Sequence, residues 1–162
     1  MLNDISLINF VDLSIEEKKM VLSWRNHPNV KQWMYNSADI LIEDHLAYIE
    51  TLKNCTDKLY FLVKQKNDYI GVIDFTNIDK VNKSSEFGLY ANSELKGMGE
   101  VLLNSICEYG FGNLNINTLI AEAFAKNKKA NSLYKRFSFK ETKKKIVNNK
   151  EVICMELKNE DR

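Results

Sequence analysis

The sequence predicts an α+β fold in which helices pack on the faces of one mixed, mostly antiparallel sheet of about seven strands. Two features lead to this prediction. Several stretches alternate apolar and polar residues with the period of two that a half-buried strand requires. Between them, apolar residues recur every three or four positions, as on one face of a helix. The expected order of elements is β-α-α-β-β-β-α-β-α-β-β, with four helices flanking the sheet.

The first third of the chain is predicted to contain one strand and two helices. Residues 5–10 form the strand. Ser14 and Glu17 have the spacing of a capping box and mark the start of a helix. This helix ends before Pro28, the only proline, and passes into a loop. An amphipathic helix is expected over residues 43–54.

The alternating pattern continues through the middle and the end of the chain. Residues 59–65 and 69–76 are predicted to form a hairpin, and residues 84–91 continue it as an antiparallel meander. A helix is expected over residues 99–112. The remaining elements are a strand over 118–124, a helix capped by Asn127, a strand that starts at Phe139 and a closing strand over 152–157.

Length, charge and cysteine content exclude several classes of protein. With 162 residues the chain is expected to form a single domain over 1–162 with a core of its own. A net charge of +1 gives no electrostatic basis for binding nucleic acid. No apolar run approaches the ~20 residues of a membrane span, and the N-terminus lacks the basic region of a signal peptide. The three scattered cysteines form no CxxC pair, so we expect reduced thiols in the cytoplasm and no metal site.

A glycine-containing loop joins the strand at 84–91 to the helix at 99–112. Gly97 and Gly99 lie directly before the helix, where unpaired N–H groups and the helix dipole favour an anion. Glycines also let a phosphate approach the backbone closely. The pattern therefore predicts a phosphate site, although it also fits an ordinary turn. The residues of this candidate site are Leu95, Lys96, Gly97, Met98, Gly99 and Glu100.

Two motifs in this order resemble those of the GCN5-related N-acetyltransferases. The family pattern Gln/Arg-x-x-Gly-x-Gly/Ala is similar to residues 94–99, with Glu94 in place of the usual Gln or Arg. A second pattern, Asn-x-x-Ala-x-x-Leu-Tyr-x-x-x-Gly-Phe, has Ser138 in place of its glycine. The residues that match this second pattern are Asn127, Ala130, Leu133, Tyr134 and Phe139. The resemblance covers nearly the whole chain.

This resemblance implies an acetyl-CoA-dependent N-acetyltransferase. The loop over 95–100 would bind the pyrophosphate of acetyl-CoA, with contributions from Asn127, Ala130 and Tyr134. Tyr134 would also protonate the departing thiolate, since a phenol is fully protonated at neutral pH. The helical spacing of Tyr134 also fits a core aromatic residue. The strand residues expected along the pantetheine arm are Phe87, Gly88, Leu89 and Tyr90.

Acetyl transfer to an amine also requires a group that removes a proton from the amine. Glu86 lies on the strand that should border the acceptor and is the first candidate. Asp74, expected at the end of the neighbouring strand, is a second candidate, and a water relayed through Thr76 is a third. An equal alternative is that Glu86 has no catalytic role and is simply exposed to solvent.

A closer resemblance concerns the acceptor. Residues 24–28, 33–35, 45–46 and 87–90 are similar to a subgroup of this family that acts in pseudaminic acid biosynthesis for flagellin glycosylation. Its members acetylate the 4-amino group of a UDP-linked 4-amino-4,6-dideoxy sugar. Arg25 and His45 are then expected to contact the diphosphate, and Met34, Tyr35 and Tyr48 the uracil. Other candidate substrate-binding residues are Asp74, Thr76 and Tyr90.

Two other functions fit the same sequence. A protein N-terminal or ribosomal-protein acetyltransferase would share the fold and the cofactor and differ in the acceptor. A non-catalytic module that binds acetyl-CoA or a nucleotide would not need Tyr134, which is present. The expected partner is a small-molecule substrate, with neither nucleic acid nor membrane, and the oligomeric state is left open.

Overall fold

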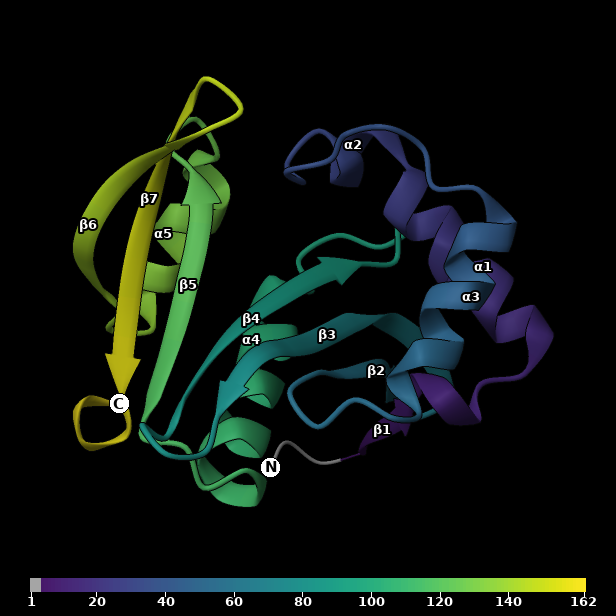
Figure 1. Cartoon of the computed structure of the whole chain (residues 1–162), viewed down its shortest axis with the longest axis horizontal. Helices are drawn as coiled ribbons and strands as arrows, with labels where there is room; N and C mark the ends of the chain where they lie inside the picture. The colour runs from purple at the N-terminus through teal and green to yellow at the C-terminus, as the bar shows by residue number, and fades with distance from the viewer. Residues whose placement is uncertain (1–3) are drawn as a thin grey trace.

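The computed structural model describes residues 4–162, which form one seven-stranded sheet with helices on both faces (Figure 1). The strand order is β1-β2-β3-β4-β5-β7-β6, and all neighbours are antiparallel except β4 and β5. The strands are β1 Ile5–Asn9, β2 Leu59–Gln65, β3 Asp68–Asp79, β4 Ser84–Ala91, β5 Thr118–Phe124, β6 Lys140–Val147 and β7 Lys150–Lys158. The helices are α1 Ile15–Asn26, α2 Pro28–Lys31, α3 Ile42–Leu52, α4 Gly99–Cys107 and α5 Lys128–Arg136.

The α+β class and the mixed sheet are confirmed, and the four longer helices correspond to those predicted. The capping box also forms, because Ser14 Oγ accepts from the Glu17 N–H at 3.1 Å and Glu17 Oε1 accepts from the Ser14 N–H at 2.9 Å. The predicted loop at Pro28 is wrong. Proline is favoured in the first turn of a helix, where its missing N–H costs nothing. Pro28 therefore starts the extra helix α2, which His27 Nδ1 caps at 3.1 Å from the Asn29 N–H.

Successive side chains of a strand point to opposite faces of the sheet, so the core consists of two layers, one on each face. Leu62 and Val72 point to the face covered by α1 and α3, where they pack with Trp24 and Ile49. Residues of opposite parity, such as Phe61 and Ile73, pack instead with α4 and α5. Figure 1 accordingly shows α4 behind β3 and β4.

The parallel pair β4–β5 is short, and this opens the sheet. The two strands pair only at Ser84↔Thr118, Ser85↔Leu119 and Glu86↔Ile120. Beyond Glu86, β4 runs on to Ala91 and β5 to Phe124 without further pairing, and Figure 1 shows them diverging. We call this opening, bordered by 87–91 and 121–124, the seam. It leaves one edge of β4 able to pair with an extended ligand.

Helix α5 ends in a Schellman motif, in which Ser138 occupies the left-handed position. Its φ is +74°, its N–H bonds to the Lys135 carbonyl at 3.0 Å, and the Phe139 N–H bonds to the Tyr134 carbonyl at 3.0 Å. The glycine conformation of the family motif is thus kept, but a serine adopts it. A side chain disfavours this conformation.

Replacing Ser138 by Gly should therefore stabilise the fold. We expect the free energy of unfolding, measured by denaturant titration, to rise by about 0.5–1 kcal/mol because the left-handed conformation no longer carries a Cβ. Ser132→Gly, on the exposed side of α5, is the matched control. It should lower stability by a similar amount, since glycine is a poor helix former. A Ser138→Gly protein no more stable than wild type would contradict the argument.

Candidate active site

The loop before α4 presents backbone N–H groups to the outside. Gly97 has a φ of +75° and open space where a Cβ would lie. Gly99 has a different role: its Cβ would be 3.1 Å from Leu133 Cδ2, so glycine here lets α4 begin close to α5. No side chain caps α4, and its first internal bond runs from the Leu102 N–H to the Met98 carbonyl. The N–H groups from 96 to 101 have no partner in the described part of the chain, so this loop can accept an anion.

Tyr134 lies on α5, which Asn127 caps by accepting from the Ala130 N–H at 3.2 Å. The ring is only 7% exposed and packs edge-on against Phe87 of β4, with 5.7 Å between the centroids. Burial, together with the charge of Asp74, raises the pKa of Tyr134 to about 12. Tyr134 therefore stays protonated at neutral pH and can donate a hydrogen bond near the seam.

Asp74 lies in the middle of β3, not at its end, since the strand runs on to Asp79. It is directly opposite Gly88 of β4 and Tyr60 of β2, so the three share one face of the sheet. A Cβ on Gly88 would be 2.7 Å from Asp74 Oδ2, so the carboxylate occupies the space that glycine leaves. Burial raises the pKa of Asp74 to about 7, and a contact with the Gly88 N–H opposes this only in part.

Glu86, the other candidate base, stands at the closed end of the seam, in the last pair with β5. Its Oε2 accepts a hydrogen bond from Asn77 Nδ2 at 2.5 Å. Thr76 is directly opposite Glu86 and partly buried. The Glu86 carboxylate thus already accepts a hydrogen bond from a side chain, whereas the Asp74 carboxylate accepts one from a backbone N–H, that of Gly88.

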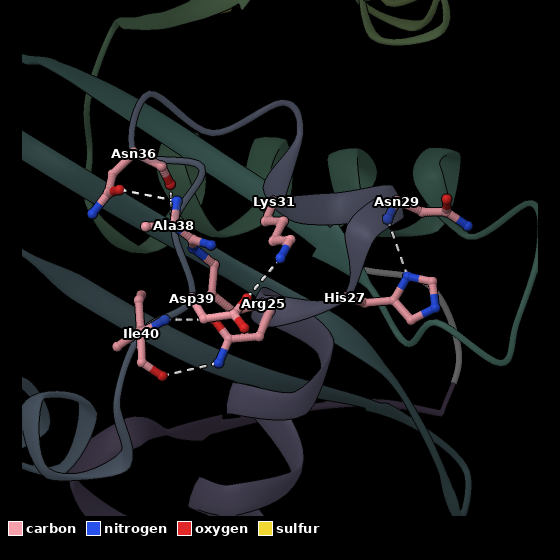
Figure 2. Close-up of polar contacts among 9 residues, drawn as sticks. Arg25, His27, Asn29, Lys31, Asn36, Ala38, Asp39 and Ile40 are labelled. Atoms are coloured by element: carbon pink, nitrogen blue, oxygen red, sulfur yellow. Dashed lines mark hydrogen bonds and ion pairs between the residues drawn. The ribbon is translucent and has the colours of Figure 1, made fainter.

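Residues 33–40, which we call the strap, run from α2 to α3 (Figure 2). Arg25 Nη2 donates to the Asn36 carbonyl at 2.7 Å. Asn26 bonds both the N–H and the carbonyl of Ile40, at 2.8 and 2.9 Å. Lys31 Nζ pairs with Asp39 at 2.8 Å, as Figure 2 shows. Helices α1 and α2 thus hold one side of the strap.

The strap also touches the other half of the sheet. Tyr35 donates its hydroxyl hydrogen bond to Glu122 Oε1 of β5 at 2.5 Å, and its ring packs edge-on against Phe124. Asn148, in the β6–β7 turn, donates to the Tyr35 carbonyl at 2.7 Å. Glu122 in turn accepts from Lys145 Nζ at 2.9 Å. Sequence reasoning missed Glu122, Lys145 and Asn148. The strap therefore links the two halves that the seam separates.

The predicted acceptor residues do not form one wall. Tyr35 packs against β5, whereas Tyr48 donates to the Tyr60 hydroxyl at 2.9 Å and packs edge-on against that ring on β2. Met34 is partly buried in the strap, and Tyr90 is partly buried on the face of Asp74. Tyr60 is a further residue that sequence reasoning missed.

The two predicted phosphate ligands have different surroundings. His45 is largely buried, and its contact with a diphosphate stays a prediction. Its ring is 7% exposed, its Nε2 lies 2.9 Å from the Lys18 carbonyl, and burial lowers its pKa, so it joins α3 to α1. Arg25, by contrast, keeps a buried Nη1 with no hydrogen-bond partner among the described residues. An unpaired guanidinium N–H is costly, which makes Arg25 a suitable anion ligand.

Residues 4–162 contain neither a membrane-spanning helix nor a cluster of side chains suited to a metal ion. No helix there is both long and apolar enough to cross a membrane. No group of three or more His, Cys, Asp or Glu side chains in that range could hold a metal ion.

Comparisons with known proteins agree with this geometry. Residues 8–140 match the model of the acetyltransferase (GNAT) domain family. The acetyltransferases PseH of two Campylobacter jejuni strains are 46% and 47% identical over 135 residues, or 83% of this chain and 84% of theirs. The crystal structure of C. jejuni N-acetyltransferase PseH in complex with acetyl coenzyme A superposes with a TM-score of 0.80 at 37% identity, covering 96% of this chain and 99% of that one.

A more distant structure shares the fold alone. Spermidine N-acetyltransferase from Vibrio cholerae, in complex with CoA and spermine, gives a TM-score of 0.87 at 18% identity, over 99% of this chain and 98% of that one. The seam, the uncapped loop and Tyr134 thus stand in a fold common to acetyltransferases of different acceptors. From the family match and the close PseH relatives, this chain belongs to the GNAT acetyltransferase family.

Proposed function

We propose that the protein transfers the acetyl group of acetyl-CoA to the 4-amino group of a UDP-linked 4-amino-4,6-dideoxy sugar, as in pseudaminic acid biosynthesis. The observation that carries the proposal is the seam, with a buried phenol on the α5 side and a partly buried carboxylate on the α1–α3 side. Similarity to PseH, which has been crystallised with acetyl-CoA, supports both the reaction and the donor.

The chain's own residues fit acetyl-CoA. The pyrophosphate would bind the unpaired N–H groups between Lys96 and Val101, and Lys96 adds positive charge. The free edge of β4 over 87–90 would pair with the amides of the pantetheine arm, as a strand pairs with an extended peptide. Asn127 and Ala130 begin the helix that carries Tyr134 and would border the same arm.

Replacing Gly97 by Val should weaken acetyl-CoA binding at least about tenfold, because a branched side chain would occupy the space where the phosphates approach the backbone. The measurement is isothermal titration with acetyl-CoA. Gly112→Val is the matched control, since Gly112 also has open space at its Cβ but lies after α4, away from the loop. Unchanged affinity in a folded Gly97→Val protein would remove the loop from the cofactor site.

Tyr134 would act on the sulfur of the donor. Acetyl-CoA supplies a thioester, whose sulfur gains negative charge as the C–S bond breaks. A thiol has a pKa near ~8.5, so complete proton transfer from a phenol of pKa about 12 is unfavourable by roughly 3–4 pKa units. Tyr134 is therefore best suited to donate a hydrogen bond to the sulfur and to pass on a proton that the amine nitrogen gives up.

For the acceptor, we infer a diphosphate beside Arg25. Its unpaired Nη1 is satisfied by a phosphate oxygen, and an arginine stays charged at all relevant pH values. Met34 and Tyr35 of the strap supply apolar and aromatic surface for a base. The nucleotide would then lie under the strap, with the sugar extending toward Asp74.

The experiment that tests this function is product analysis by mass spectrometry. The protein is incubated with acetyl-CoA and, separately, a UDP-4-amino-4,6-dideoxy sugar, spermidine and N-terminal peptides. We expect acetylation of the nucleotide sugar, and inhibition by UDP that is competitive with the sugar nucleotide and not with acetyl-CoA. If peptides or spermidine are acetylated and UDP has no effect, the acceptor is not a nucleotide sugar.

A further inference from the structure

We infer that Asp74 is the residue that takes the proton from the acceptor amine, and that Gly88 is the residue that positions it. The inference rests on the proposed acetyl transfer to an amine and adds the identity of the base. It requires a carboxylate at the open part of the seam, free of a cationic partner, and held in place by its neighbours.

The placement of Asp74 meets the first requirement. Its register partner Gly88 lies two residues beyond Glu86, the last β4 residue that pairs with β5. The carboxylate lies over Gly88, with both oxygens within 3.2 Å of where a Cβ would be. An amine that reaches the seam from the α1–α3 face therefore passes this carboxylate.

The surroundings meet the second requirement. The ionisable groups that face Asp74 are Tyr60 from β2, Tyr90 from β4 and Tyr134 from α5, all neutral acids at physiological pH. Arg25 of α1 interacts with Tyr60 and Tyr90 instead. Among residues 4–162, no lysine, arginine or histidine forms an ion pair with Asp74.

A buried carboxylate without a cation binds protons more readily than one in water, and burial raises the pKa of Asp74 to about 7. A general base is most effective when its pKa is near the working pH. Glu86 is less well placed, because it stands where the strands are still paired and Asn77 already donates a hydrogen bond to it. The geometry therefore favours Asp74.

The ammonium group of the acceptor gives one proton to the Asp74 carboxylate, which later releases it to water. The nitrogen lone pair forms the C–N bond while the electron pair of the C–S bond leaves with sulfur. The second proton moves from nitrogen to sulfur, with Tyr134 as the relay. The products are the amide, the free thiol and one released proton.

The test is the pH dependence of kcat/KM. Wild type should show an acidic limb with an apparent pKa near 7, from Asp74. In Asp74→Asn, kcat/KM should fall ~10²–10⁴-fold at pH 7 and this limb should disappear, leaving only the ionisation of the amine. The affinity for acetyl-CoA should stay unchanged. A limb that persists in Asp74→Asn but is lost in Glu86→Gln would overturn the inference in favour of Glu86.

Gly88 is tested by a double-mutant cycle. Gly88→Ala places a Cβ 2.7 Å from Asp74 Oδ2 and must displace the carboxylate, so kcat/KM should drop at least tenfold and the acidic limb should shift. In an Asp74→Ala background no carboxylate remains to be displaced, and Gly88→Ala should then have little further effect. An equal loss of kcat/KM in both backgrounds would show that the effect of Gly88→Ala does not involve the Asp74 carboxylate.

A third measurement does not depend on the acceptor. A carboxyl whose folded pKa is raised holds its proton better in the folded state, so wild type loses stability as pH rises from about 4 to about 7. The Tm of Asp74→Asn should exceed that of wild type at pH 8 and equal it at pH 4. Equal Tm values at both pH values would contradict the inferred environment of Asp74.

If the acceptor proves to be another amine, the nucleotide-sugar proposal fails, whereas the pH profile with that amine still tests Asp74.

Discussion

The enzyme with Phe in place of Tyr134 should turn over ~10²–10⁴-fold more slowly than wild type and bind acetyl-CoA equally well. The substitution keeps the ring contacts with Phe87 and Phe139, at 5.7 and 5.6 Å, and removes only the hydroxyl. Without that hydrogen bond, negative charge would accumulate on the departing sulfur in a buried site, where it is poorly stabilised. The effect should therefore appear in kcat.

The matched control is Tyr109→Phe. Tyr109 follows α4 and packs against Phe61 and Phe75 on the same side of the sheet, but its ring is away from the seam. This variant should keep the kcat of wild type. Titration calorimetry with acetyl-CoA and the Tm of each variant establish that binding and folding are intact. A Tyr134→Phe enzyme within about threefold of the wild-type kcat would remove the hydroxyl from the mechanism.

Truncation of Arg25 to Ala should raise the KM for a UDP-sugar about 10- to 150-fold, equivalent to about 1.5–3 kcal/mol, while the KM for acetyl-CoA stays near wild type. The reason is the buried Nη1, which has no hydrogen-bond partner among the described residues and would meet a phosphate oxygen. The effect should persist from pH 6 to pH 9, since an arginine does not lose its charge in this range.

Arg25 also holds the strap through the Asn36 carbonyl, so a control must separate the two roles. Lys31→Ala removes another strap contact, the ion pair with Asp39, without touching Arg25. If Lys31→Ala raises the KM for the nucleotide sugar as much as Arg25→Ala does, the strap and not the guanidinium accounts for the loss. A small effect of Lys31→Ala assigns the loss to the phosphate contact.

Sequence patterns predicted most of the sheet, because apolar and polar residues alternate along a strand that has one buried face. They failed at Pro28, where a residue that ends one helix also starts the next. They also did not show that His45 is buried, although the signal was present. His45, Ile49 and Leu52 stand four and three positions apart, which places the histidine on the buried face of α3.

These patterns could not predict contacts between segments that are far apart in the sequence. Tyr35 and Glu122 are 87 residues apart, and alternation along β5 tells which face Glu122 occupies but not what lies opposite. The open space over Gly88, which Asp74 fills, likewise depends on the register of two strands. Both candidate bases were identified by residue type, whereas their difference in hydrogen bonding became visible only in three dimensions.

With the acceptor site proposed above, the strap would add a second component to the acceptor's affinity. Tyr35 is both a proposed contact for the base of the nucleotide and the residue that bonds Glu122 across the seam. In the proposed site, a nucleotide beneath the strap would require the conformation in which this bond and the one from Asn148 are broken. The apparent dissociation constant is then the intrinsic one divided by the fraction of molecules that are open. The same equilibrium controls how quickly an acetylated product escapes, so strap opening, and not acetyl transfer, can limit turnover.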